Sequence, residues 1–96
     1  MPPAGRAAVP EAFTLSAFPN PFNARAELLF TLPRAARVTL RIFDVTGREA
    51  ATLTARDYPA GTHRVHFDAS DFASGTYFAR LDGVGFEQTV KLVLMK

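Results

Sequence analysis

The sequence predicts an all-β fold, an immunoglobulin-like antiparallel β-sandwich of about seven strands. Three observations favour it. Apolar residues recur at every second position in several stretches, and no stretch has the 3.6-residue period of a helix. Clusters of Gly, Pro, Asn and Asp interrupt these stretches at near-regular spacing. The chain has 96 residues, of which 48% are hydrophobic, which is enough for one domain with a modest core. Short antiparallel strands with one apolar face bury it by packing two sheets together.

The first two predicted strands cover residues 12–18 and 25–32, and a proline-rich corner separates them. Pro19 and Pro21 have fixed φ angles, lack an N–H, and force Phe18 and Asn20 into extended conformations. The segment can be neither helix nor central strand. We therefore predict that it is a structural corner formed by Pro19, Asn20, Pro21, Phe22 and Asn23.

The next two strands, residues 37–44 and 48–55, form a hairpin. Asp44 at the first turn position and Gly47 at the last are typical of a type I turn followed by a Gly bulge. A break at residues 58–61 leads into a strand at 62–68. This strand places His63 on one face and His66 on the other.

The last two strands cover residues 75–81 and 86–95 and are joined through a Gly-rich turn at 82–85. In immunoglobulin-like sandwiches, a Tyr early in a late strand directs its hydroxyl to the backbone of the preceding corner. Tyr77 is our candidate for this role, with the small Gly75 two residues before it. A Tyr half-buried at the start of a strand is the alternative.

The composition disfavours several classes of function. The net charge is +2 and the nine Arg residues are scattered, so there is no basic stripe for nucleic acid. The absence of cysteine excludes disulfides, thiolate metal sites and a Cys nucleophile. A domain of this size rarely has spare core for a catalytic cleft, and Ser, His and Asp follow no nucleophile motif. We expect neither an enzyme nor a cofactor.

Metal binding is also not expected. His63 and His66 point to opposite faces, so they cannot share a metal ion. Asp68, Ser70 and Asp71 carry oxygen ligands, but their spacing is sparser than in a dedicated calcium loop, and turn capping is the favoured interpretation.

Residues 1–12 are rich in Pro, Ala and Gly and are predicted to be a linker, followed by one domain at 13–96. We expect no signal peptide and no membrane span in this chain. Phe43 and Phe78 lie on the outer faces of their strands by alternation. They contact either a partner or another part of the chain.

A series of short motifs identifies a family resemblance. They occur in one order along the chain, at residues 18–23, 30–33, 42–49, 60–63, 67–70, 74–81 and 91–96. Together they resemble the type A C-terminal sorting domain of type IX secretion cargo and the related immunoglobulin-like domain of flagellar hook-capping proteins. Many sorting domains have a Gly soon after the Pro-x-Pro unit, whereas this chain has Asn23, Ala24 and Arg25 there.

The resemblance implies a non-catalytic module that directs export of an upstream enzyme or adhesin across the outer membrane and its attachment to the cell surface. The implied partners are the outer-membrane secretion machinery or surface-attachment proteins, and the upstream domain of the same polypeptide. The implied location, after transit through the periplasm, is the cell surface or the medium, and we expect a monomeric module.

The expected recognition element is the last strand, which has free backbone groups if it lies at a sheet edge. Its residues are Lys91, Leu92, Val93, Leu94, Met95 and Lys96. Two alternatives stay open: a structural domain as in hook-capping proteins, and a carbohydrate-binding accessory domain of a secreted glycoside hydrolase. The chain has no Trp and only two Tyr as candidate sugar platforms.

Overall fold

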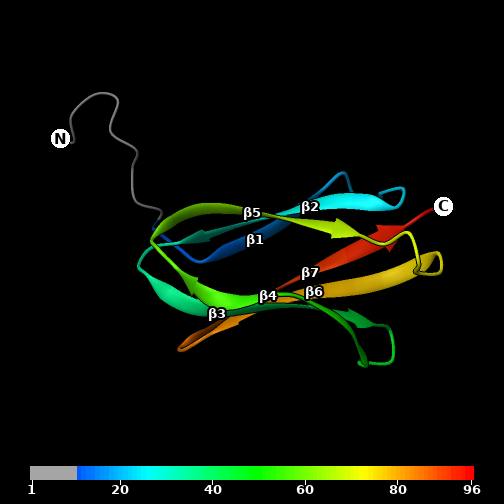
Figure 1. Ribbon diagram of the computed structural model, residues 1–96. Helices are drawn as coiled ribbons and strands as arrows, with labels where there is room; N and C mark the ends of the chain where they lie inside the picture. Colours follow the sequence, from blue (N-terminus) through cyan, green and yellow to red (C-terminus); the bar gives the residue numbers. More distant parts are fainter. Residues whose placement is uncertain (1–10) are drawn as a thin grey trace.

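The computed structural model describes residues 11–96, which form seven strands in two packed sheets (Figure 1). Most of the predicted linker, residues 1–10, lies outside the described residues. The strands are β1 (Thr14–Phe18), β2 (Arg25–Leu32), β3 (Ala36–Asp44), β4 (Glu49–Tyr58), β5 (Gly61–Asp68), β6 (Gly75–Gly83) and β7 (Phe86–Leu94). Among these residues there is no helix that is long and apolar enough to cross a membrane.

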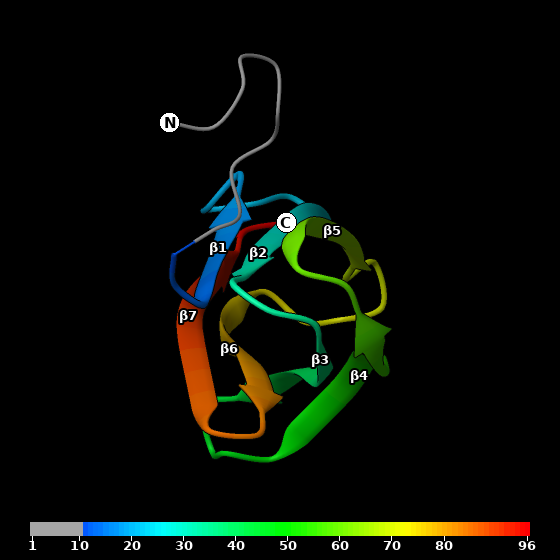
Figure 2. The same cartoon turned by 90° about the vertical axis from the view of Figure 1, so that its left-hand side faces the viewer.

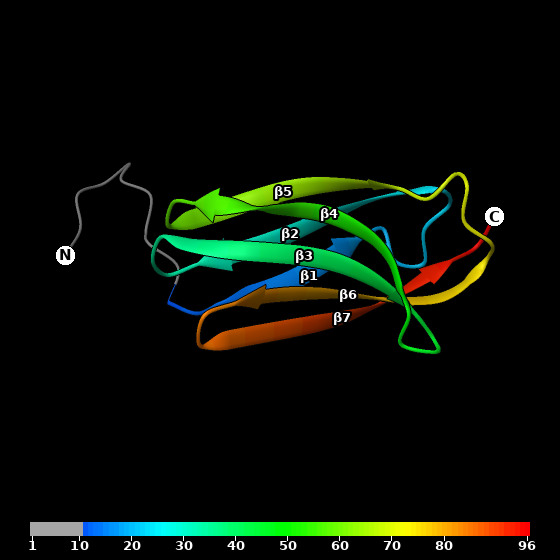
Figure 3. The same cartoon turned by 60° about the horizontal axis from the view of Figure 1, so that its bottom comes forward.

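One sheet has the order β1-β2-β5 and the other β4-β3-β6-β7, with antiparallel pairing throughout both (Figures 2 and 3). The chain changes sheet between β2 and β3, between β4 and β5, and between β5 and β6. These crossings bring together strands that are distant in sequence, as in immunoglobulin-like sandwiches. The predicted fold class is confirmed.

The core consists of the inward residues of both sheets. In β2 they are Leu28, Phe30 and Leu32, and β3 contributes Val38, Leu40 and Ile42, all at most 1% exposed. Burying one side chain of this kind contributes about 1.5–3 kcal/mol. The period-two pattern read from the sequence therefore corresponds directly to the buried face of each sheet.

Strand β4 is longer than predicted and differs most from the sequence pattern. It extends to Tyr58 instead of residue 55, and its register against β3 shifts twice, at Leu40/Arg41 and at Ile42/Phe43. Tyr58 is buried, packs edge-on against Phe30 at 5.1 Å between ring centroids, and its hydroxyl lies 2.8 Å from Thr54 Oγ1. The bulges obscure the alternation in the sequence, while the packing of the Tyr58 ring extends the strand.

Two predicted local motifs are confirmed. Gly47 has φ +85°, and its N–H donates to the Asp44 carbonyl at 3.0 Å, which closes the expected turn. The Tyr77 hydroxyl donates to the Ala73 carbonyl at 2.7 Å, the bond expected of a tyrosine corner. Gly75 begins β6, two residues before Tyr77.

Candidate functional site

Strand β7 lies at the edge of the four-stranded sheet, and its side chains divide into two groups. Leu92 and Leu94 are fully buried in the core. Lys91, Met95 and Lys96 are exposed, Met95 by 59%. Of the predicted recognition residues, these three are the exposed ones, and Val93 is half-buried.

The Asn20 side chain pairs with two outward backbone groups near the end of β7. The Asn20 side-chain amide donates from Nδ2 to the Lys91 carbonyl at 2.7 Å, and Oδ1 accepts from the Val93 N–H at 3.0 Å. A side-chain amide carries the same donor and acceptor as a peptide group. Because Pro19 and Pro21 have no N–H, the Asn20 side chain provides the pairing that a neighbouring strand would otherwise provide.

Phe22 continues this pairing with its own backbone. Its N–H donates to the Val93 carbonyl, and its carbonyl accepts from the Met95 N–H, both at 2.9 Å. These bonds form an isolated parallel bridge between Phe22 and Leu94. The Phe22 ring is 2% exposed and packs 5.8 Å from Phe67. We call residues 19–22 the corner clamp.

The clamp corrects one expectation. The sequence suggested that β7 offers free backbone groups for strand addition, but the Lys91 carbonyl, both outward groups of Val93 and the Met95 N–H are bonded to Asn20 and Phe22. The bonds join residues about seventy positions apart, which local sequence patterns cannot reveal. Asn23, predicted as part of the same corner, is exposed and takes no part in these bonds.

Ala24 has a backbone conformation that Gly adopts more readily. It has φ +68°, a left-handed conformation that L-residues adopt at a cost of about 1–2 kcal/mol. The turn directs the Ala24 carbonyl at the N–H of Ala69, at 2.6 Å, and so starts the pairing of β2 with β5. A Gly would adopt this conformation without the steric cost.

The last residue is held in place as well. The Lys96 N–H donates to Ser74 Oγ at 3.0 Å, and the Lys96 ammonium donates to the Ser70 carbonyl. The corner clamp, residues 69–74 and residues 91–96 together form one end of the sandwich, which we call the terminal end. The described chain enters at the opposite end (Figure 1), where Phe13 stacks on Phe86 with ring centroids 3.6 Å apart.

Comparison with known proteins identifies the family of the chain. A family model described as the secretion system C-terminal sorting domain matches residues 16–95. The chain belongs to this family. The match includes both the corner clamp and β7 of the sorting domain. No curated protein and no solved structure matches the chain.

The outer face of the four-stranded sheet is partly covered by the sorting domain itself. The guanidinium groups of Arg41 and Arg80 lie over the Phe43 ring, at 5.5 and 4.7 Å from its centroid. Phe78 is the register partner of Phe43, and both rings are half-buried. Of the two contacts considered for Phe43, the intramolecular one is therefore present.

One carboxylate holds the two arginines together. Asp82 Oδ2 accepts from Arg41 at 2.8 Å and from Arg80 Nε at 2.9 Å, and Glu49 lies 3.5 Å from Arg41. Partial burial raises the pKa of Asp82, but the hydrogen bonds and charges of the two guanidinium groups outweigh this effect and hold the pKa below its usual value. Asp82 thus screens two like charges that face each other across β3 and β6.

The residues considered for metal or sugar binding have structural roles. The His63 ring donates a hydrogen bond from Nε2 to the Pro59 carbonyl at 2.8 Å, while His66 faces solvent on the other face of β5. Asp68 caps its turn by accepting from the Ser70 N–H at 3.0 Å. Within residues 11–96, no three His, Cys, Asp or Glu side chains gather into a possible metal site.

The two tyrosines are unsuited to sugar stacking. Tyr58 is 7% exposed, and its ring lies beneath the Arg56 guanidinium, 3.9 Å from the ring centroid. Tyr77 is held in the corner by its bond to Ala73. Since a sugar platform needs an open aromatic face, these positions give the carbohydrate-binding alternative no support.

Proposed function

We propose that this sorting domain directs export of an upstream enzyme or adhesin across the outer membrane and its attachment to the cell surface. Membership of the sorting-domain family supports a role as a C-terminal signal for type IX export. The observation that carries the finer proposal is the terminal end. There, the family's proline-rich corner and its last strand form one hydrogen-bonded unit with Lys91, Met95 and Lys96 on its surface.

The proposed mechanism is recognition of a folded surface by the outer-membrane machinery. Residues 91–94 pair with β6 on one side, and the corner clamp bonds the Lys91 carbonyl, both outward groups of Val93 and the Met95 N–H on the other. A partner that reads the folded domain therefore meets the exposed side chains of Lys91, Met95 and Lys96. The chain enters at the other end (Figure 1), so an attached cargo would leave these side chains accessible.

A reporter fusion tests this function. The whole chain, fused to the C-terminus of a periplasmic reporter in a type IX-competent bacterium, should bring the reporter to the cell surface or the medium. A triple variant with Lys91, Met95 and Lys96 replaced by Ala should leave the reporter folded in the periplasm. The matched control replaces Val45 and Val84, which are exposed by 68% and 89% and lie in turns outside residues 91–96, and should be exported normally.

Two outcomes would contradict the proposal. Periplasmic retention of an abundant, folded wild-type fusion would remove the export role itself. Equal export of the triple variant and the control would leave an export role but exclude these side chains as the recognition surface. Thermal unfolding of the purified variants shows whether any loss of export reflects loss of the fold.

A further inference from the structure

The first and last described strands run side by side in the same direction. Phe13, just before β1, stacks on Phe86, the first residue of β7, with ring centroids 3.6 Å apart. Beyond the other end of β1, the corner clamp forms a parallel bridge from Phe22 to Leu94. Figure 2 shows β1 beside β7 at one flank of the sandwich. The chain therefore enters beside the start of β7, while the end of β7 lies at the terminal end.

The entry of the chain is anchored by stacked side chains. The Arg34 guanidinium lies 5.1 Å from the centroid of the Phe13 ring, and Phe86 stacks on the same ring. The Phe86 ring in turn lies so close to Gly83 that a Cβ there would be 2.2 Å from it. We call this end of the sandwich the entry end. A force applied through the upstream chain reaches β1 at this point.

Four hydrogen bonds join the far end of β1 to the end of β7. The Asn20 side chain bonds to the Lys91 carbonyl and the Val93 N–H, and the Phe22 backbone bonds to the Val93 carbonyl and the Met95 N–H. Hydrogen bonds between neighbouring strands lie across the strands. Pulling the entry end away from the terminal end moves the corner clamp and β7 in opposite directions along the strands. The four bonds are then loaded together, in shear.

The ladders of the same two strands are loaded in the same way. Strand β7 pairs with β6 without a register shift from Phe86 to Leu94, and β1 pairs with β2 from Thr14 to Phe18. A strand pulled along its own axis loses its ladder bonds together, whereas a strand peeled from one end loses them pair by pair. The corner clamp is the shortest link in this path, because it joins β1 directly to β7.

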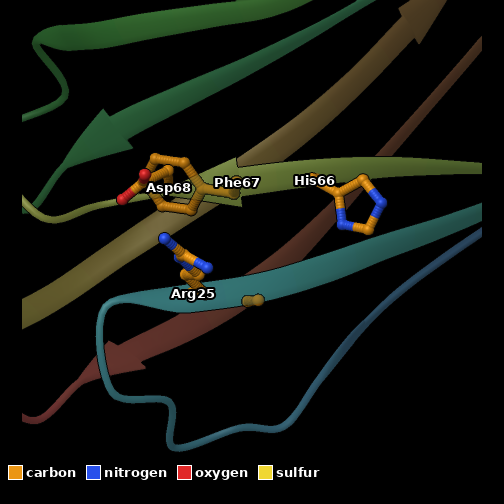
Figure 4. Close-up of a pocket in the computed structure, with 5 residues that line it drawn as sticks. Arg25, His66, Phe67 and Asp68 are labelled. Atoms are coloured by element: carbon orange, nitrogen blue, oxygen red, sulfur yellow. The ribbon is translucent and has the colours of Figure 1, made fainter.

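The start of β2 and the end of β5 lie outside this path. A hollow of about 280 Å³ lies there (Figure 4). It is lined by Arg25, Ala26, His66, Phe67 and Asp68. Strand β5 pairs with β2 in one unbroken register and is the last strand of its sheet, so its other edge is free among the described strands. Unlike β7, β5 therefore has no clamp that joins it to the entering chain.

We propose that the domain is a force-bearing link between the upstream chain and the terminal end, in which the corner clamp and β7 carry tension in shear. The link keeps Lys91, Met95 and Lys96 in their folded arrangement while tension acts on an attached cargo. This use during export rests on the proposed function. The mechanical resistance itself follows from the strand directions and does not depend on export.

Unfolding of the whole chain in optical tweezers measures this resistance. The chain has no Cys, so cysteines added before Met1 and after Lys96 are the only attachment points, and they pull along the strands. In a second version, Val84→Cys replaces the C-terminal attachment. Val84 is 89% exposed in the turn before Phe86, so this axis peels the entry end apart. At the same force, unfolding along the strands should be at least about thirtyfold slower, the factor for two hydrogen bonds that break together.

Asn20→Ala isolates the contribution of the corner clamp. It removes two of the four bonds, so unfolding along the strands should be about thirtyfold faster than in the matched control Asn23→Ala. On the peeling axis the two variants should unfold at the same rate, because the entry end opens before the clamp is loaded. His66→Ala, whose side chain is 80% exposed beside the hollow, should change neither axis.

Three results would overturn the proposal. Equal unfolding rates on the two axes would exclude loading in shear. Equal rates for Asn20→Ala and Asn23→Ala along the strands would exclude the clamp as the element that carries the tension. An equal acceleration of Asn20→Ala on both axes would show that Asn20 contributes only general stability. Because these measurements involve no secretion, their failure is distinct from failure of the reporter fusion.

Discussion

Asn20→Ala removes the link between the proline-rich corner and the last strand. The Asn20 amide makes two hydrogen bonds to β7, at 2.7 Å to Lys91 and 3.0 Å to Val93. Each bond contributes a net of about 0.5–1.5 kcal/mol, so the variant should lose about 2 kcal/mol of its free energy of unfolding. For a domain of this size, such a loss lowers the melting temperature by about 8–16 °C.

Urea denaturation with linear extrapolation measures this loss. The matched control is Asn23→Ala, three residues along the same corner, because Asn23 is exposed and makes neither of these bonds. Hydrogen exchange of the Val93 amide gives a local readout. The exchange should be faster in Asn20→Ala than in the wild type, and unchanged in Asn23→Ala. Equal stability of the two variants, with unchanged exchange at Val93, would refute the clamp as a source of stability.

Three further substitutions test other parts of the structure. Ala24→Gly should raise the free energy of unfolding by about 0.5–1 kcal/mol, because relief of the left-handed strain exceeds the added entropy of the unfolded chain; a lower urea midpoint would contradict this. Asp82→Asn should flatten the acid dependence of stability. The folded-state pKa of Asp82 is lowered, so its contribution is complete above about pH 5 and is lost as pH falls below about 3.9, toward the folded-state pKa. Urea midpoints measured across that pH range test this prediction, and identical pH profiles of the wild type and Asp82→Asn would exclude the role of Asp82. Leu92→Ala should cost about 2–5 kcal/mol because its side chain is fully buried, whereas Met95→Ala should leave the melting temperature nearly unchanged; equal melting temperatures would show that Leu92 is not a core residue.

The clamp also has a consequence for export. Asn20→Ala leaves residues 91–96 unaltered but removes two of the bonds that hold them. If the machinery reads the folded terminal end, this variant should export a fused reporter less efficiently than Asn23→Ala. Equal export by both would indicate that the machinery reads residues 91–96 without the clamp.

Much of the local structure could be predicted from residue types and spacing. The turn at Gly47 depends on a backbone conformation that Gly adopts readily, and Asp44 identifies its start. The hydrogen bond from the Tyr77 hydroxyl to the Ala73 carbonyl joins residues only four positions apart. The predicted end of β4 was wrong for two reasons. The bulges break the period of two, and the burial of Tyr58 depends on Phe30, a residue of the other sheet.

The candidate site was predicted less completely. The sequence pointed to both the proline-rich corner and the last strand, but as two separate features. Leu92 and Leu94 were grouped with Lys91, Met95 and Lys96, although the first two belong to the core. Strict alternation from Leu92 onward would have separated them, since every second side chain of an edge strand faces inward.

By itself, the sequence determined the fold class, the places where the chain turns and the family. The fold class follows from short-range periodicity and the turns follow from the φ preferences of Pro and Gly. The family follows from an ordered set of local motifs. Only the tertiary structure decided that Asn20 and Phe22 pair with Lys91, Val93 and Met95, and that β5 keeps a regular free edge. The physical reason is that strand neighbours across a sandwich are set by how the two sheets bury their apolar faces together. Hydrogen bonds between residues about seventy positions apart form only once that packing has brought the edges into register.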